Sequence, residues 1–89
     1  MIRRRVLVSG QVQGVFFRDT CRRKAIALGV TGWVRNLPDR RVEAVFEGDA
    51  EDVERMLGWT RQGPAHAVVH RLEIFDEPPE GLWSFEITA

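Results

Sequence analysis

The sequence lacks several features that would assign it to a specialised class of protein. Its 89 residues include one cysteine, so no internal disulfide can form and nothing requires an oxidising compartment. Thirteen basic and thirteen acidic side chains balance, whereas broad binding to nucleic acid or membranes usually requires an excess of Lys and Arg. No apolar stretch has the length of a secretory signal or a membrane span. We therefore expect a cytoplasmic monomer that binds neither nucleic acid nor membranes.

The composition that remains is that of an ordinary globular protein. The chain is 44% hydrophobic and 29% charged, and its length allows one hydrophobic core. No internal repeat, low-complexity tract or linker interrupts it. These properties predict a single domain over residues 1–89.

Hydrophobic periodicity predicts strands and helices in alternation. Apolar residues that alternate with polar ones predict strands over residues 6–12, 33–35, 42–47, 67–75 and 83–87. Helical spacing predicts one helix over residues 18–28, stopped by Gly29, and a second between the N-cap Asp49 and the stop Gly63-Pro64. This order, β-α-β-β-α-β plus a short terminal strand, is typical of the ferredoxin-like split βαβ arrangement. That α+β fold places two helices on one face of an antiparallel sheet.

Residues 10–18, Gly-Gln-Val-Gln-Gly-Val-Phe-Phe-Arg, form the most informative segment of the chain. They connect a predicted strand to a predicted helix, where backbone N–H groups and the helix dipole favour an anion. Arg18 adds a planar fork of donors that suits phosphate or carboxylate oxygens. The segment lacks the Gly-Lys-Ser/Thr ending of a nucleotide-binding loop, and the chain has no obvious carboxylate site for Mg²⁺. It therefore predicts a cradle for an anion, with phosphate as the leading candidate.

Two motifs resemble the signatures of the acylphosphatase family. Residues 10–18 resemble the first signature, and Gly32-Trp33-Val34-Arg35-Asn36-Leu37, followed by Asp39 and Val42, resembles the second. The similarity continues through Glu47-Gly48, Gly63-Pro64 and the closing Phe85-Glu86-Ile87, in the correct order and without large insertions.

This resemblance implies hydrolysis of acyl phosphates to a carboxylate and inorganic phosphate, without a metal or a cofactor. By similarity, Arg18 matches the family's phosphate-binding arginine and Asn36 its water-positioning asparagine. The backbone amides expected to hold the phosphate of the substrate, and to bind product phosphate as an inhibitor, belong to Gln13, Gly14, Val15, Phe16, Phe17 and Arg18.

The chemistry of acyl phosphates is consistent with these residue types. The leaving carboxylate is a weak base, so no strong general acid is required. The protein must hold the phosphoryl group in line and stabilise charge on its oxygens. Asn36 can accept a hydrogen bond from water through its carbonyl and donate to phosphate through its amide, and so orient the nucleophile without acting as a base.

Other functions of the same fold are weighed against hydrolysis. RNA recognition would need surplus positive charge and exposed aromatic residues on a central strand, and the strand over residues 6–12 has none. A regulatory module would need a partner domain or an oligomer. Two alternatives remain open: a non-catalytic module that binds a phosphorylated small molecule, and an acyl-phosphate-binding domain of a larger enzyme. The presence of both Arg18 and Asn36 disfavours the second of these.

Several other reactive or charged residues are expected to be structural. Cys21 lies on the apolar face of the first predicted helix, which favours a small buried side chain over a nucleophile. His66 and His70 fall in a strand-like segment, where side chains four residues apart lie far from each other, so no metal site is expected. The arginines at 3–5 precede the first predicted strand and are expected to form a solvated terminus. At most they would steer anionic substrates.

Three further features of the sequence can be checked in a structure. The tryptophans at 33, 59 and 83 are expected in the core or at its rim. Arg40 occupies a hairpin position where the family usually carries glycine, and a positive φ there would cost about 1 kcal/mol. Asp19, next to Arg18, must point away from a bound anion.

Overall fold

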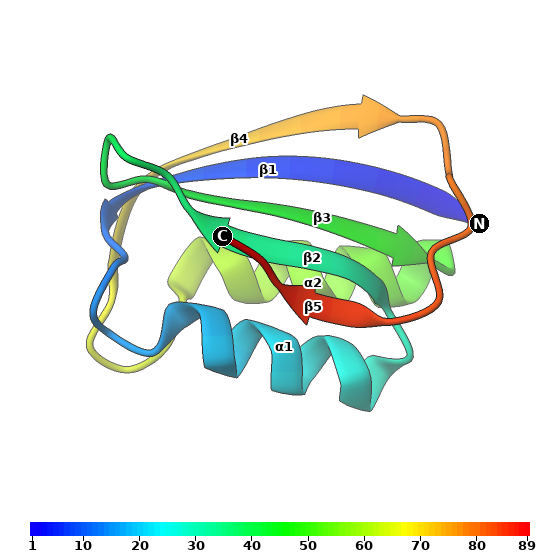
Figure 1. The fold of residues 1–89 in the computed structure, drawn as a ribbon, viewed down its shortest axis with the longest axis horizontal. Coiled ribbons are helices and arrows are strands. Elements are labelled where there is room, and N and C mark those ends of the chain that lie inside the picture. Colours follow the sequence, from blue (N-terminus) through cyan, green and yellow to red (C-terminus); the bar gives the residue numbers. More distant parts are fainter.

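The computed structural model describes residues 1–89 as a sheet with both helices on one of its faces (Figure 1). The elements follow the order β1 (Ile2–Gln11), α1 (Phe17–Leu28), β2 (Thr31–Asn36), β3 (Val42–Gly48), α2 (Ala50–Gln62), β4 (Val68–Glu77) and β5 (Phe85–Ile87). The five strands lie in the order β4-β1-β3-β2-β5. The expected ferredoxin-like α+β arrangement is therefore confirmed.

Strand direction differs between the main sheet and its last strand. Strand β1 pairs antiparallel with β3 and with β4, and β2 pairs antiparallel with β3. Strand β5 instead pairs in parallel with β2, which makes the complete sheet mixed. This last strand brings the C-terminal residues next to the end of β2 that leads to Asn36.

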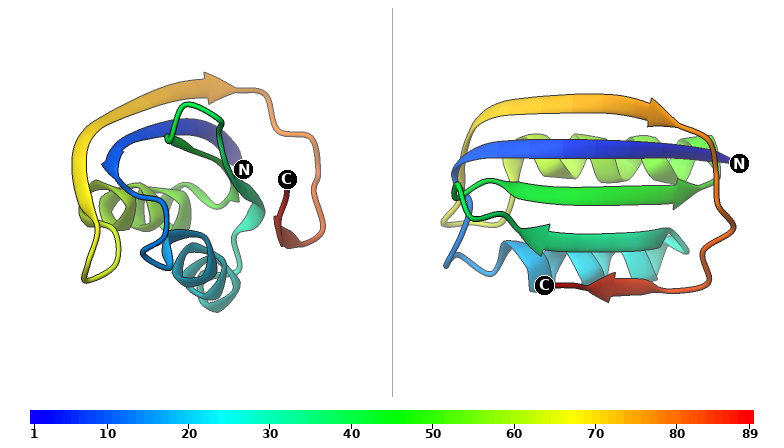
Figure 2. Two further views of the ribbon diagram at one scale, coloured as in Figure 1. Left: turned by 60° about the vertical axis from the view of Figure 1, so that its left-hand side comes forward. Right: turned by 45° about the horizontal axis from the view of Figure 1, so that its top comes forward.

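The hydrophobic core fills the space between the sheet and the two helices, which both views of Figure 2 place on the same side of the sheet. Alternation along the strands directs every second side chain toward the helices. Fully buried apolar residues of this layer include Val6, Val8, Val34, Val42, Ala44, Phe46, Cys21, Ala25, Val53 and Met56. Each large aliphatic or aromatic side chain buried here stabilises the fold by about 1.5–3 kcal/mol.

Three of the four helix ends form as expected. Gly29 ends α1 in the left-handed conformation, and its N–H donates to the carbonyls of Ala25 and Ile26. Gly63 follows the end of α2, and its N–H donates to the carbonyl of Trp59. Asp49 occupies the N-cap of α2, although its side chain makes no capping hydrogen bond. The start of α1 differs, because its N-cap is Phe16 in a left-handed conformation.

The prediction of a solvated terminus at residues 3–5 was wrong. These arginines lie within β1, which begins at Ile2, and Arg3 is only 6% exposed. Its guanidinium pairs with Glu47 of β3 at 3.2 Å, Glu77 of β4 at 2.9 Å and Glu80 at 3.3 Å. Residues 3–5 are three consecutive arginines, so this part of the strand has no alternation of apolar and polar residues, and hydrophobic periodicity could not extend the strand to Ile2.

The tryptophan expectation is confirmed at Trp59, which packs against the core and lies on Phe17 with ring centroids 5.0 Å apart. It was wrong for Trp33, which is half-buried outside this core, with the Arg35 guanidinium 5.3 Å above its ring. For Trp83 the expectation was wrong, since this side chain is 95% exposed and precedes β5. Phe85 provides the buried aromatic ring of that strand instead.

None of the helices is long and apolar enough to span a membrane.

Candidate functional site

The loop between β1 and α1 adopts a tight turn with two left-handed residues. Gly14 has φ 74° and Phe16 has φ 62°. A Cβ added at Gly14 would meet no atom within 4 Å, so glycine is favoured there by its φ angle and not by space. For Phe16 the same conformation costs about 1–2 kcal/mol, because the side chain crowds the backbone. The turn therefore holds an unfavourable conformation immediately before the helix.

This turn leaves a run of backbone donors without partners. No N–H group of residues 14–19 donates a hydrogen bond to another backbone group, and Phe16 has no side chain able to cap the helix. The first N–H groups of a helix carry its positive partial charge and attract anions when they are uncapped. The start of α1 thus has free donors where a negatively charged group would be stabilised.

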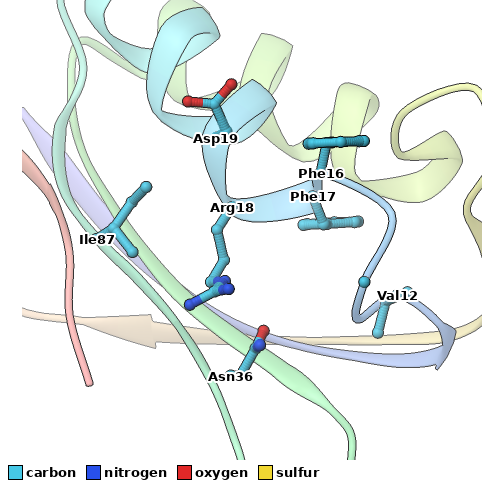
Figure 3. A pocket seen from close by; sticks show the side chains of 8 residues that line it. Val12, Phe16, Phe17, Arg18, Asp19, Asn36 and Ile87 are labelled. Atoms are coloured by element: carbon cyan, nitrogen blue, oxygen red, sulfur yellow. The ribbon is translucent and has the colours of Figure 1, made fainter.

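A pocket of about 350 Å³ opens at this turn (Figure 3). Its lining comes from the loop, the first turn of α1, the end of β2 and the last strand, and comprises Val12, Gly14, Phe16, Phe17, Arg18, Asp19, Asn36 and Ile87. Figure 3 shows the guanidinium of Arg18 extending from α1 toward Asn36. The two residues predicted to be catalytic, which lie on different elements, therefore share one pocket.

The charges around Arg18 leave its guanidinium without a carboxylate partner. Its neighbour Asp19 pairs with Arg23, one turn along the helix, at 2.9 Å. Figure 3 shows the Asp19 carboxylate on the opposite side from the Arg18 guanidinium, as the sequence analysis required.

Asn36 is the last residue of β2, and the hydrogen bonding of its side-chain amide is incomplete. Its Oδ1 atom is buried and accepts no hydrogen bond. A buried acceptor without a partner costs about 1–3 kcal/mol, so such atoms are rare outside functional sites. Asn36 is also one of the residues that line the pocket, so the acceptor without a partner belongs to a side chain that a bound group can contact.

Only part of the predicted phosphate-binding segment lines the pocket, and Gln13 instead contacts the neighbouring hairpin. Gly14, Phe16, Phe17 and Arg18 line the pocket, whereas Gln13 and Val15 do not. The Gln13 Nε2 donates to the carbonyl oxygens of Leu37 and Arg41, each at 2.9 Å. Gln13 therefore ties the β1–α1 loop to the β2–β3 hairpin, which begins directly after Asn36.

Sequence reasoning missed this bridge, and it also missed Ile87 as a pocket residue. A long-range hydrogen bond to backbone carbonyls leaves no signal in the sequence. Ile87 lies in an alternating terminal strand, but only the parallel pairing with β2 places it at the pocket.

The chain is similar to known proteins over nearly its whole length. The acylphosphatase family model matches residues 4–87. The chain is a member of the acylphosphatase family. It is 60% identical to the acylphosphatase of Rubrobacter xylanophilus over 77 residues, which cover 86% of this chain and 70% of that protein. It is 56% identical to the acylphosphatase of Gloeobacter violaceus, covering 97% of this chain and 92% of that protein.

A solved structure shows the same architecture. The crystal structure of acylphosphatase from Bacillus subtilis superposes with a TM-score of 0.96 at 30% sequence identity, and the match covers 100% of both chains. Together these relationships establish the protein as an acylphosphatase, an enzyme that hydrolyses acyl phosphates and releases inorganic phosphate.

The position where the family usually carries glycine has a positive φ in this chain. Arg40 has φ 75°, in the hairpin between β2 and β3. Asp39 supports the turn, because its carboxylate accepts the Arg41 N–H at 3.2 Å and the Arg41 Nε at 2.8 Å. The Arg41 N–H, helped by its guanidinium, holds the pKa of Asp39 below its ordinary value.

The remaining reactive side chains lie outside the pocket. Cys21 is fully buried on α1, as expected, and burial raises the pKa of its thiol. His66 and His70 are both exposed. No three His, Cys, Asp or Glu side chains are grouped so that they could hold a metal ion.

Proposed function

We propose that Arg18, Asn36 and the backbone N–H groups of residues 13–18 carry out acyl phosphate hydrolysis without a metal or a cofactor. The observation that carries the proposal is their convergence. One pocket holds an unpaired guanidinium, a buried amide oxygen without a partner and the uncapped start of a helix.

Phosphate binding is the first step. The phosphoryl oxygens accept hydrogen bonds from the free N–H groups of the loop and of the first turn of α1, where the helix dipole adds positive potential. The Arg18 guanidinium donates in parallel to two of these oxygens. Because Asp19 pairs with Arg23, no carboxylate competes for Arg18.

Attack by water is the second step. The Asn36 Oδ1 accepts a hydrogen bond from the water, and its amide donates to the phosphate, so the nucleophile is held next to phosphorus. The transition state for phosphoryl transfer is loose, and the carboxylate leaves without protonation, so neither a strong base nor a strong acid is needed. The P–O bond to the acyl oxygen breaks and its electron pair leaves with the carboxylate, while the oxygen and both protons of the water stay with phosphorus, so that the second product is H₂PO₄⁻.

We also propose that the enzyme acts as a cytoplasmic monomer without nucleic-acid or membrane partners. Cys21 is a buried free thiol, which agrees with a reducing compartment. The balanced charge of the sequence supports the absence of polyanionic partners.

The test is hydrolysis of benzoyl phosphate with a chelator present, by the natural enzyme, Arg18→Gln and Asn36→Ala. We expect each substitution to lower kcat/KM by about 10²–10³-fold, because each removes a preorganised group at the reacting phosphate. Arg18→Gln should also raise the inhibition constant of inorganic phosphate, whereas Asn36→Ala should act mainly on kcat. Arg61→Gln, which removes an exposed charge from the end of α2, is the matched control. Activity that needs a metal, or that survives both substitutions, contradicts the proposal.

A further inference from the structure

A second pocket lies in the groove between the two helices. Its volume is about 290 Å³, and the helices that enclose it lie side by side on one face of the sheet (Figure 2). Each helix supplies three of its lining residues, which are Lys24, Ala27 and Leu28 of α1 and Arg55, Met56 and Trp59 of α2. None of them lines the pocket at Arg18 and Asn36, so the proposed hydrolysis leaves this groove without a role.

The walls of the groove are mostly apolar. Leu28 and Trp59 are partly buried against the core and Met56 is fully buried, whereas Ala27 is exposed. These residues present an indole ring, a thioether and two aliphatic side chains to one small pocket. Pockets for small ligands start at roughly 300 Å³ and are lined mainly by such side chains. The groove therefore has the size and the apolar surface to bind a molecule of about one aromatic ring.

The charges at the groove favour a ligand with a single negative charge. Arg55 pairs with Asp52 of its own helix at 3.1 Å, and Arg23, next to Lys24, pairs with Asp19 at 2.9 Å. Lys24 has no carboxylate within ion-pair distance, and no acidic residue lines the groove. One cation is thus left unpaired beside an apolar wall, where it attracts one anionic group.

We propose that the groove binds a small carboxylate with an apolar body. The carboxylate lies at the Lys24 ammonium, and the apolar body lies against Trp59, Met56 and Ala27. This is the chemical class of one product of the enzyme, since hydrolysis of an acyl phosphate releases a carboxylate. A phosphate group fits less well, because its second negative charge would find no unpaired cation.

Trp59 connects the groove to the pocket at Arg18. Its ring packs on the ring of Phe17 with centroids 5.0 Å apart, and Phe17 begins α1 and lines that pocket. Phe17 is 2% exposed, and a Cβ placed on Gly63 would lie 3.0 Å from its ring, so the ring has little free space. A ligand that displaces Trp59 therefore acts on Phe17 as well.

This contact predicts that the two pockets are coupled. We expect a carboxylate in the groove to change the affinity for phosphate, and phosphate to change the affinity for the carboxylate by the same factor. The coupling rests on the proposed phosphate site, whereas the groove does not.

Titration of the full chain with benzoate tests the groove, by NMR spectra that resolve the three Trp indole N–H signals. Inorganic phosphate is kept at saturation so that benzoate does not occupy the site at Arg18. We expect the Trp59 signal, assigned from its loss in Trp59→Phe, to shift and saturate with a dissociation constant of about 1–10 mM. Trp33 and Trp83 are internal references, because neither lines the groove. Shifts of all three signals that do not saturate would show nonspecific contact only and overturn the site.

Substitutions and analogues assign the two parts of the ligand. Lys24→Gln should weaken benzoate binding about three- to fivefold, whereas Arg61→Gln, which removes an exposed charge of α2 outside the groove, should leave it unchanged. Acetate keeps the charge but lacks the apolar body, and benzyl alcohol keeps the ring but lacks the charge. Both should bind more weakly than benzoate, acetate by about tenfold. Undiminished binding of benzoate by Lys24→Gln, or of benzyl alcohol by the natural enzyme, would overturn the carboxylate assignment.

The dependence of benzoate binding on phosphate separates the remaining outcomes. Competition for one site would raise the apparent Kd of benzoate in proportion to phosphate without limit, which would overturn the groove. Coupling between two sites instead brings this Kd to a new constant value, which we expect to differ about fivefold from the value without phosphate. A benzoate Kd that is independent of phosphate would overturn the coupling through Trp59 and Phe17. If Arg18→Gln binds phosphate as the natural enzyme does, the proposed phosphate site fails while the groove stands.

Discussion

Gln13 connects the two halves of the proposed catalytic apparatus through its side chain. The loop that it belongs to contributes N–H groups and leads to Arg18, while the hairpin that it contacts follows Asn36. Its single Nε2 atom satisfies two carbonyl oxygens of that hairpin, of Leu37 and Arg41. Arg41 O also accepts the N–H of Leu37 at 2.8 Å, so the bridge joins the hydrogen bond that closes the hairpin. We interpret Gln13 as a positioning residue that sets the distance between phosphate and held water.

The substitution Gln13→Met tests this interpretation, because methionine has a similar shape but no donor. We expect kcat to fall about tenfold, since displacing a nucleophile by less than 1 Å can cost that much. The inhibition constant of inorganic phosphate should change less than kcat, because the backbone donors remain. Steady-state kinetics and phosphate inhibition measure the split, and Gln62→Met at the end of α2 is the control. An equal loss in phosphate binding and kcat would show that Gln13 only maintains the loop.

Arg40 has a left-handed backbone conformation, which is unfavourable for a residue with a side chain. The left-handed conformation costs a residue with a side chain about 1–2 kcal/mol, and glycine avoids this cost but loses more chain entropy on folding. We therefore expect Arg40→Gly to raise the free energy of unfolding by about 0.5–1 kcal/mol. Urea denaturation measures the change. A decrease would show that the Arg40 side chain makes stabilising contacts that exceed its backbone strain.

Glu47 of β3 anchors the segment that leads from β4 to β5. Its carboxylate is fully buried and accepts hydrogen bonds from the N–H groups of Glu80, Gly81 and Leu82, at 3.1, 2.6 and 3.1 Å. The Arg3 guanidinium completes its partners at 3.2 Å. Burial alone would raise the pKa of Glu47, but these donors outweigh it and hold the pKa below its ordinary value. A buried carboxylate thus holds a chain segment that has no regular structure of its own.

The variant Glu47→Gln keeps the size of this side chain and removes its charge. We expect the free energy of unfolding to fall by about 2–3 kcal/mol, since charge-assisted hydrogen bonds are lost and one amide group faces several donors. Chemical denaturation of Glu47→Gln and of the exposed control Glu54→Gln provides the comparison. Equal stability of the two variants would contradict the anchoring role.

Glu47 and Glu77, which both pair with Arg3, also make the stability of the whole molecule depend on pH. The Arg3 guanidinium, assisted by Arg5, holds the pKa of Glu77 below its ordinary value, and Glu47 behaves in the same way. In the unfolded chain both groups titrate near about 4.3. The folded protein therefore binds fewer protons than the unfolded chain once the pH falls toward that value, and unfolding takes protons up.

We expect stability to be constant above about pH 5 and to decline as the pH falls through 4 and below, because a lowered pKa stabilises only the ionised fold. Thermal unfolding between pH 7 and pH 3 measures the decline. Glu47→Gln, which has one such carboxylate fewer, should lose stability less steeply. A flat or rising stability toward low pH would contradict this assignment.

Local sequence patterns determined most of the element order, because each element depends on side chains close together in the chain. The three- and four-residue spacing from Phe17 to Leu28 predicted α1, Gly29 and Gly63 predicted helix ends, and alternation predicted the strands. The turn at residues 10–18 could also be predicted from the sequence, because a turn with glycines between a strand and a helix depends on residues that are close together in the chain. Its family resemblance implied the partnership of Arg18 with Asn36.

Contacts between distant segments followed only from the register of the sheet. The pairing of Arg3 with Glu47 and Glu77 turned an expected solvated terminus into a buried network, because β1 lies between β3 and β4. The Gln13 bridge and the position of Ile87 have the same origin. The sequence alone thus predicted a phosphate-binding turn and the chemistry that this turn favours. The pocket around that turn, including its apolar residue Ile87, depended on strand pairing. Strand pairing sets the distances between residues that are far apart in the sequence, and no local sequence pattern predicts those distances.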